Sequence, residues 1–140
     1  MKKLLIASLL VSIGIMTQAQ SHSLWEINLM KINDKKNTSD YLRLLQANYG
    51  EVRELGIKEK YVLSYKILQD TTTTRETSWD FMLVTEYASK ELMHKFEKDY
   101  SMLSKKARPN GALKINGKNF NELGKSLYYT VLLNDPSKGN

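Results

Sequence analysis

The sequence predicts an α+β domain in which a four-stranded antiparallel sheet carries two helices on one face. Segments rich in apolar, β-branched and aromatic residues alternate with segments of helical apolar spacing, in the order strand, helix, strand, strand, helix, strand. Subtracting an N-terminal leader of 19 residues from the 140 of the chain leaves 140 − 19 = 121, which suits one domain.

The first 19 residues have the features of a secretory signal peptide. Two lysines follow the initiator methionine, an apolar stretch runs from Leu4 to Met16, and Ala19 supplies a small residue at the expected cleavage site. This stretch is shorter than the roughly 20 residues that span a bilayer, so cleavage is favoured over a retained anchor. We therefore expect residues 1–19 to be removed and residues 20–140 to form one exported domain, periplasmic or secreted.

The composition excludes several classes of protein. The chain has no cysteine, which excludes disulfides, thiolate metal sites and a cysteine nucleophile. Without the two leader lysines the net charge falls from +6 to 19 − 15 = +4, and basic and acidic residues are mixed along most of the chain, so no nucleic-acid interface is expected. Only the segment from Lys105 to Lys125 is one-sided; a solvated loop and a contact with an anion or a membrane surface both fit it.

The first half of the domain begins with a strand and continues into a helix. Leu24–Ile32 is apolar and partly alternating, which predicts a strand with both faces at least half buried. Apolar residues then recur at helical spacing over Tyr41–Leu55, with Gly56 as the expected left-handed end and Gly50 as a possible bend. The polar residues that can cap this helix are Thr38, Ser39 and Asp40.

A hairpin and a second helix follow. Tyr61–Leu68 and Ser78–Tyr87 are rich in β-branched and aromatic residues, and the polar stretch between them is turn-like. Ser89 is placed to cap a helix whose apolar stripe includes Phe96 and which ends before Pro109. The rest of the chain contains a short helical turn near Phe120–Leu123 and a last strand over Ser126–Leu133.

This order of elements is the ferredoxin-like, split βαβ order. It leaves one face of the sheet without helices, and a homodimer is the simplest way to cover that face. The large apolar residues expected there are Trp25, Ile27, Leu29, Phe81 and Leu83.

The chain resembles the dimeric α/β-barrel superfamily, which includes antibiotic-biosynthesis-type and haem-degrading monooxygenases and related uncharacterised proteins. The resemblance rests on a first strand that runs into a capped helix and on Ser89-Lys90 at the start of the second helix. It implies that Asn28 points into a cleft between sheet and helices, as an asparagine of the monooxygenase branch does, and that Phe96 lines this cleft. The region that would supply an iron-binding histidine reads Ser104-Lys105-Lys106, so no haem or other cofactor is expected.

Five residues are candidates for a ligand site, and each has a structural alternative. Asn28 either satisfies its amide within the fold or orients a ligand carbonyl. Glu26, like Asp80 and Glu86, is either a general base or a salt-bridge partner of a strand lysine such as Lys31 or Lys66. The others are Trp79, Phe96 and His94, which either line a pocket or belong to the core and the surface.

These observations lead to one functional prediction with two alternatives. We expect an exported homodimer that binds a small, largely apolar ligand between sheet and helices. A cofactor-independent monooxygenase or isomerase using the same cleft is the first alternative, and a non-catalytic interaction module is the second. One histidine in the folded body and no clustered carboxylates predict no metal site, and no Ser-His-Asp arrangement or phosphate-binding glycine loop is present.

Overall fold

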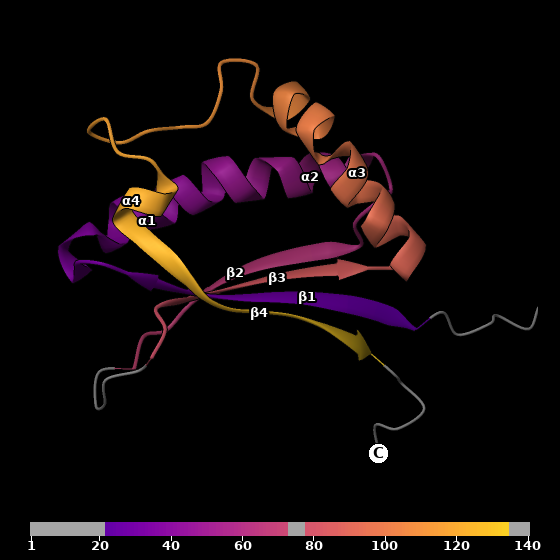
Figure 1. Ribbon diagram of the computed structural model, residues 1–140, viewed down its shortest axis with the longest axis horizontal. Helices are drawn as coiled ribbons and strands as arrows, with labels where there is room; N and C mark the ends of the chain where they lie inside the picture. The colour runs from indigo at the N-terminus through magenta and orange to yellow at the C-terminus, as the bar shows by residue number, and fades with distance from the viewer. Residues whose placement is uncertain (1–21, 73–77, 135–140) are drawn as a thin grey trace, which may run out of the picture.

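The computed structural model describes residues 22–72 and 78–134, so the predicted signal peptide lies outside the described residues. A four-stranded antiparallel sheet has the order β2-β3-β1-β4, and helices cover one of its faces (Figure 1). This confirms the predicted fold class. The elements are β1 (Ser23–Ile32), a 3₁₀ turn (Lys35–Asn37), α1 (Thr38–Leu45), a π-helical turn (Gln46–Gly50), α2 (Glu51–Lys58), β2 (Ser64–Gln69), β3 (Phe81–Tyr87), α3 (Lys90–Ala107), α4 (Phe120–Leu123) and β4 (Gly124–Asn134).

The core lies between the sheet and the helices and has two parts. One joins side chains of β1 and β3 to α1, and its buried members are Met30, Ile32, Tyr41, Leu44, Leu45, Phe81, Leu83 and Leu123. The other joins β3 to α2 and α3 through Val52, Tyr61, Val62, Tyr87, Met93, Phe96 and Leu103. Full burial of such a side chain contributes about 1.5–3 kcal/mol, so the two clusters supply most of the stability of a chain without disulfides.

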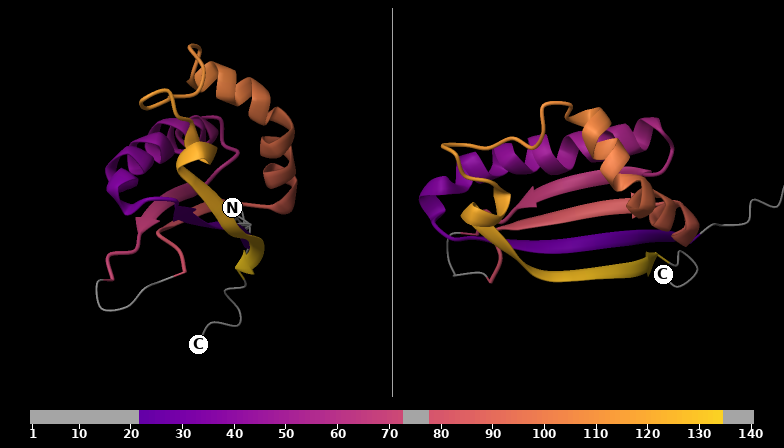
Figure 2. Two further views of the ribbon diagram at one scale, coloured as in Figure 1. Left: turned by 60° about the vertical axis from the view of Figure 1, so that its left-hand side comes forward. Right: turned by 45° about the horizontal axis from the view of Figure 1, so that its top comes forward.

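On the free face of the sheet, the residues of β1 are those that were predicted, but the residues of β3 are different. Figure 2 shows that none of the described helices covers this side. Met82 pairs with Leu29, and Val84 pairs with Ile27, so both β3 residues lie on the free face. Phe81 and Leu83 are buried beneath the helices, and the prediction for these two residues was wrong. Because β3 is apolar on both faces, its alternation alone does not determine which residues face the helices.

The first helix also differs from the prediction. Asp34 caps the 3₁₀ turn by accepting a hydrogen bond from the Lys36 amide, and Thr38 is already the first residue of α1, so the predicted caps at positions 38–40 were wrong. A π-helical turn then separates α1 from α2 and ends at Gly50, the residue at which a bend was expected. Gly56 lies inside α2 and does not end it.

The end of α2 shows why Gly56 is a glycine. Lys60, with φ of 63°, is the left-handed residue that follows the helix. A Cβ atom at Gly56 would lie 2.8 Å from Cε2 of Phe96 and 3.0 Å from Cγ2 of Val62. Gly56 therefore permits α2 to approach α3 closely, and a turn conformation is not the reason for it.

The second half of the chain agrees with the prediction. Ser89 caps α3 by accepting a hydrogen bond of 3.2 Å from the Leu92 amide, and α3 ends before Pro109. The short helix α4 has the predicted bounds, and Asn119 and Glu122 form a capping box at its start. Among the described helices, none combines the length and the apolar character needed to cross a membrane.

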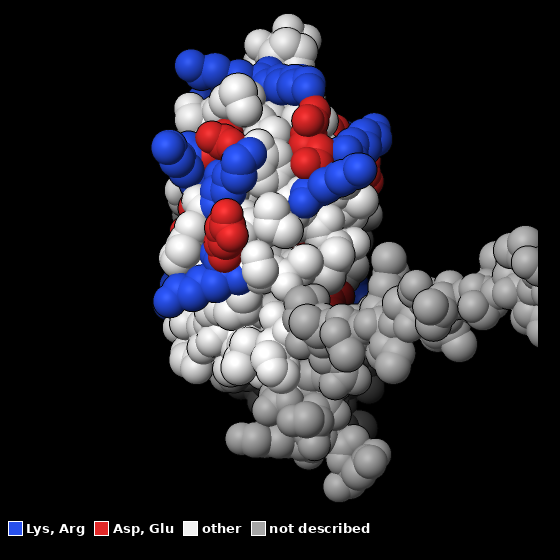
Figure 3. All heavy atoms as spheres, turned by 90° about the vertical axis from the view of Figure 1, so that its right-hand side faces the viewer, with Lys and Arg blue, Asp and Glu red and all other residues white. Residues whose placement is uncertain are grey.

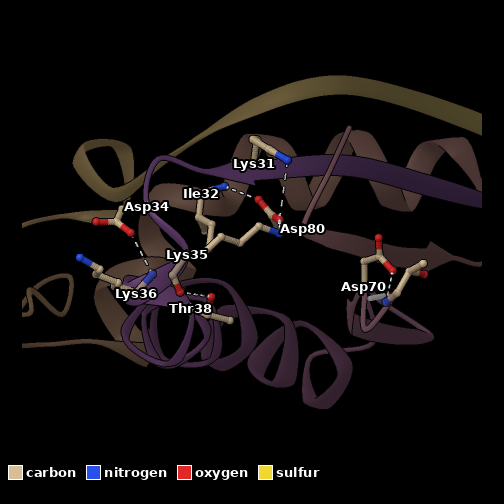
Figure 4. A network of polar contacts seen from close by, with 9 residues as sticks. Lys31, Ile32, Asp34, Lys35, Lys36, Thr38, Asp70 and Asp80 are labelled. Carbon is tan, nitrogen blue, oxygen red and sulfur yellow. Dashed lines mark hydrogen bonds and ion pairs between the residues drawn. The ribbon is translucent and has the colours of Figure 1, made fainter. Parts of the chain in front are cut away.

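A buried carboxylate joins the end of β1 to the start of β3. Asp80 accepts a 2.8 Å hydrogen bond from the Ile32 amide and forms an ion pair with Lys35 (Figure 4). The Lys31 ammonium lies 3.8 Å from the same carboxylate, which confirms the salt bridge expected from the sequence. Asp80 is 4% exposed, and these partners compensate the cost of burying its charge. This contact fixes the start of the 3₁₀ turn and α1 relative to the sheet.

Candidate ligand-binding cleft

A cleft of about 400 Å³ lies between the sheet and the helical layer. Its floor comes from β1 and β3, one wall from the π-helical turn, α2 and α3, and the opposite wall from the loop between α3 and α4. The residues that line it are Glu26, Asn28, Asn48, Tyr49, Arg53, Leu83, Tyr100, Arg108, Ala112, Leu113, Asn119, Phe120 and Asn121.

A buried ion pair occupies the floor of the cleft. Nη2 of Arg53 donates to Oε1 of Glu26 at 3.1 Å, and the hydroxyl of Tyr87 donates to Oε2 of Glu26 at 2.8 Å. The side chains of Arg53 and Glu26 are only 9% and 12% exposed. Each oxygen of the Glu26 carboxylate accepts a hydrogen bond from the protein. The Glu26–Arg53 pair is therefore a fixed polar group in the floor of the cleft.

Aromatic rings surround the guanidinium of Arg53. Its central carbon lies 4.0 Å from the ring centre of Tyr49, 5.2 Å from that of Phe96 and 5.6 Å from that of Tyr100. A cation over aromatic faces is attracted by their quadrupoles, and more strongly where water is excluded. Arg53 is therefore held by rings on two helices as well as by Glu26.

Tyr49 connects the helical layer to the sheet. Its hydroxyl lies 2.6 Å from Oγ1 of Thr85, which is fully buried in β3. Burial raises the pKa of Tyr49, and burial together with the charge of Glu26 raises the pKa of Tyr87. Both phenols therefore stay neutral at neutral pH, Tyr49 in the lining of the cleft and Tyr87 buried behind Glu26.

Asn28 lies beside the ion pair on β1. Its Oδ1 accepts a 2.6 Å hydrogen bond from Oγ of Ser126 in β4. This hydrogen bond leaves Nδ2 of the amide available as a donor. Asn28 lines the cleft together with Glu26, as the two alternate positions of one strand require.

Asn48 holds the opposite wall in position. Its Oδ1 accepts from the Leu113 amide at 2.7 Å and from Nη1 of Arg108 at 2.9 Å, and its Nδ2 donates to the Leu113 carbonyl at 3.1 Å. Asn48 lies in the π-helical turn, and such turns change the direction of side chains relative to a regular helix. One side chain thus fastens the loop after α3 to the helix that faces it.

Comparisons with known proteins identify the fold. No protein-family model matches the chain, and no curated protein sequence is significantly similar to it. A dimeric protein of unknown function and ferredoxin-like fold from Bacteroides fragilis matches with a TM-score of 0.50 and 12% identity, over 79% of this chain and 95% of that one. A variant of SnoaB, a cofactor-independent oxygenase from Streptomyces nogalater, matches with a TM-score of 0.50 and 5% identity, over 79% and 91%.

The chain has a ferredoxin-like fold. The likeness to these proteins confirms the ferredoxin-like fold that the order of elements predicted. At identities of 5% and 12% the similarity establishes the fold alone, so any activity must be inferred from the residues of the cleft.

The five predicted site residues lie in different surroundings. Glu26 and Asn28 line the cleft together. Phe96 is 1% exposed and packs behind Arg53 in the second core cluster. His94 is 56% exposed, with Nδ1 3.1 Å from Glu97, and Trp79 is half-buried next to Asp80; neither is among the residues that line the cleft.

Apart from Glu26 and Asn28, the residues that line the cleft were missed from the sequence. Arg53 and Asn48 lie in a helical segment where polar residues usually face solvent, and Arg108 lies in the basic segment. Tyr49 and Arg53 are four positions apart, which is the one sequence signal that they share a side of the helix. Within the described ranges, no three His, Cys, Asp or Glu side chains come together as metal ligands.

Proposed function

We propose that the protein is an exported homodimer that binds a small, largely apolar molecule in the cleft. The observation that carries this proposal is the cleft itself. Its size suits a small ligand, and apolar residues such as Leu83, Leu113 and Phe120 share the lining with a few fixed polar groups. Sites for small molecules have this composition, in which apolar area supplies affinity and convergent polar groups set orientation.

The polar groups indicate how a ligand would be oriented. Nδ2 of Asn28 donates to a carbonyl or hydroxyl oxygen of the ligand, because Oδ1 is already bound by Ser126. The hydrogen bonds and ring contacts of Arg53 and Glu26 hold the neighbouring floor rigid, so ligand binding does not have to order it.

Native mass spectrometry of the purified protein tests ligand binding. We expect a reproducible adduct on the wild-type protein. Ala112→Trp places a large side chain at the exposed edge of the cleft and should remove the adduct. Met102→Trp, at an exposed position of α3 outside the cleft, should retain it. Absence of any adduct from wild-type protein, or its persistence in Ala112→Trp, would contradict the proposal.

The free face of the sheet supports a dimer. Trp25, Ile27, Leu68, Met82 and Val84 line a hollow of about 190 Å³ on this face, together with Ser64, Lys66 and Glu86. Figure 3 shows one end of the molecule, where charged side chains of both signs gather on the upper part. Trp25 and Leu132 are 40% and 49% exposed, and a second copy would remove this apolar surface from water. The Bacteroides fragilis neighbour is dimeric.

Sedimentation velocity tests the dimer. Ile27→Lys introduces a charge among the apolar residues of the free face and should give a monomer, because an interface there would have to bury the new ammonium group close to Lys66. Met102→Lys adds the same charge on α3 and should remain dimeric. A dimer that survives Ile27→Lys would contradict the use of this face.

Export is proposed from the N-terminal sequence alone. Intact mass of the protein recovered from the exported fraction should correspond to a chain that begins at Gln20. A retained leader, or recovery only from the cytoplasm, would contradict it.

Catalysis by a cofactor-independent oxygenase or isomerase is the second candidate, and the donor of Asn28 favours it because such a donor can stabilise an enolate oxygen. Glu26 accepts hydrogen bonds at both oxygens, so an enzyme would need to displace Tyr87 or Arg53 before Glu26 could act as a base. Incubation of the released adduct with protein under air, followed by mass analysis and NMR spectroscopy of the small molecule, separates the two: a changed mass or a changed spectrum indicates catalysis, and a molecule unchanged in both indicates binding.

A further inference from the structure

Arg108 differs from every other charged group of the cleft in having only neutral partners. It follows the last residue of α3 and lies in the basic segment from Lys105 to Lys125. Its Nη1 donates to Oδ1 of Asn48, and its Nη2 donates to Oγ of Ser104. Among the described residues no carboxylate forms an ion pair with it, and its buried Nε has no hydrogen-bond partner.

The charges of the cleft therefore do not cancel. Arg53 and Glu26 neutralise each other across 3.1 Å. Arg108 adds one positive charge to the lining, and no other lining residue carries a negative charge. A partly desolvated guanidinium gains more from a negatively charged oxygen than from amide or hydroxyl oxygens.

The guanidinium is also held in place before any ligand arrives. Asn48 binds Arg108 and the Leu113 backbone with the same oxygen, so Arg108 is fixed relative to the loop wall. A long side chain that is already ordered loses little conformational entropy when it binds a ligand.

The apolar part of the lining indicates which kind of molecular framework the anionic group of the ligand is attached to. The rings of Tyr49, Tyr100 and Phe120 line the cleft, and Leu83 and Leu113 add aliphatic surface. Flat aromatic ligands match walls of this kind because ring contacts combine area burial with favourable edge and face geometry.

We propose that the cleft selects small aromatic molecules that carry one negatively charged oxygen group, such as a carboxylate or sulfonate, and that Arg108 recognises this group. This rests on the proposed function, because it names the class of ligand for the same cleft. It also gives a role to one residue of the basic segment that the sequence left open between a solvated loop and an anion contact.

Two fluorescent probes with the same aromatic body test the proposal. Anilinonaphthalene sulfonate carries the anion, and phenylnaphthylamine lacks it. Wild-type protein should bind the sulfonate more tightly. Arg108→Gln should weaken sulfonate binding by roughly tenfold or more, which is the expected loss of a charge-assisted hydrogen bond, and should leave binding of the neutral probe unchanged. Arg108→Lys should retain part of the preference, because the charge remains and the planar fork is lost.

The outcomes separate this inference from the proposed function. If Ala112→Trp removes binding of both probes and Arg108→Gln weakens them equally or not at all, the cleft binds ligands without selecting anions and the inference is wrong. If Ala112→Trp affects neither probe, the probes bind outside the cleft and the inference is wrong, whereas the proposed function is decided separately by the adduct of the wild-type protein and its loss in Ala112→Trp. Thermal unfolding of each variant, followed by circular dichroism, verifies that Arg108→Gln remains folded.

Discussion

At the scale of single residues, the cleft depends on a charge whose partner is far away in the sequence. Glu26 was a candidate from its position beside Asn28 on an apolar strand, and the structure adds Arg53 as its partner. This pairing could not be predicted from the sequence. Arg53 lies between Glu51 and Glu54, which are both exposed, and such a charged stretch of helix is typical of a solvated surface. Contact between α2 and β1 turns the same residue into a buried one.

Replacement of Glu26 by glutamine should destabilise the protein strongly. The change leaves the Arg53 guanidinium buried without a counter-charge, and the expected loss is about 3–5 kcal/mol in the free energy of unfolding. Urea denaturation measures it. Glu54→Gln is the control, because the hydrogen bond of Glu54 with Tyr65 is exposed, and its loss should be below about 1 kcal/mol. Equal effects of the two substitutions would show that the pair is not buried in solution.

The double variant Glu26→Leu/Arg53→Met should be considerably more stable than Glu26→Gln in urea denaturation. It removes both charges of the pair and with them the cost of burying either one. If the double variant is less stable than Glu26→Gln, the rings around Arg53 contribute more to stability than the ion pair does.

At the scale of elements, the sequence predicted where helices and strands lie better than how they end and face. Apolar spacing identified the strands, the long helix α3 and the turn α4. It did not show that a π-helical turn separates α1 from α2, and one continuous helix was predicted instead. A π-helical turn adds a single residue to a helical turn, which changes the apolar spacing only slightly. The faces of β3 were misassigned for a related reason, since Phe81, Met82, Leu83 and Val84 are all apolar.

Gly56→Ala tests the contact between α2 and α3. The new methyl group would lie 2.8 Å from the Phe96 ring, inside the core, and should cost about 1–3 kcal/mol despite the better helix propensity of alanine. In Gly50→Ala the nearest atom is the Tyr65 hydroxyl at 3.2 Å, at the end of a side chain that can move. Thermal unfolding should therefore show a much smaller loss for Gly50→Ala. The reverse order would contradict the packing described for Gly56.

At the scale of the whole molecule, the layers were predictable and the cleft was not. The order of six elements determines a sheet with helices on one side. The cleft instead depends on Asn48 and Leu113, which are 65 positions apart and are joined by hydrogen bonds. Loops between elements have no periodicity from which such a contact can be inferred.

Alkaline conditions should weaken the whole fold. Burial raises the pKa of Tyr41, Tyr49 and Tyr87, and burial and the hydrogen bond to Glu54 raise the pKa of Tyr65 to about 12. In the unfolded chain these phenols titrate near pH 10. Above that pH the folded state binds more protons than the unfolded state, so the free energy of unfolding falls as pH rises, and the stabilisation is fully present below about pH 10.

Urea denaturation between about pH 9 and about pH 12 measures this effect. Each tyrosine that stays protonated only in the folded state should contribute a fall of about 1.4 kcal/mol per pH unit. Tyr41→Phe should reduce the slope, because it removes one fully buried titrating phenol. Replacement of an exposed residue such as Met102 by lysine should leave the slope unchanged. A constant stability up to pH 12 would contradict the burial of these phenols.

The register between β1 and β4 shifts between Leu29 and Met30, so β4 contains a bulge, and this bulge determines where the strand can lose a residue. Met30 pairs with Ser126 and Leu29 with Tyr128, so Leu127 is the one residue between these pairs without a partner on β1. Ser126 therefore faces the cleft beside Asn28, and Tyr128 faces the opposite side. Loss of Leu127 would leave each remaining side chain of β4 on its present face, whereas loss of a residue within 128–133 would exchange the faces of those on one side of the gap. A deletion in this strand is thus tolerable at one position and disruptive at its neighbours.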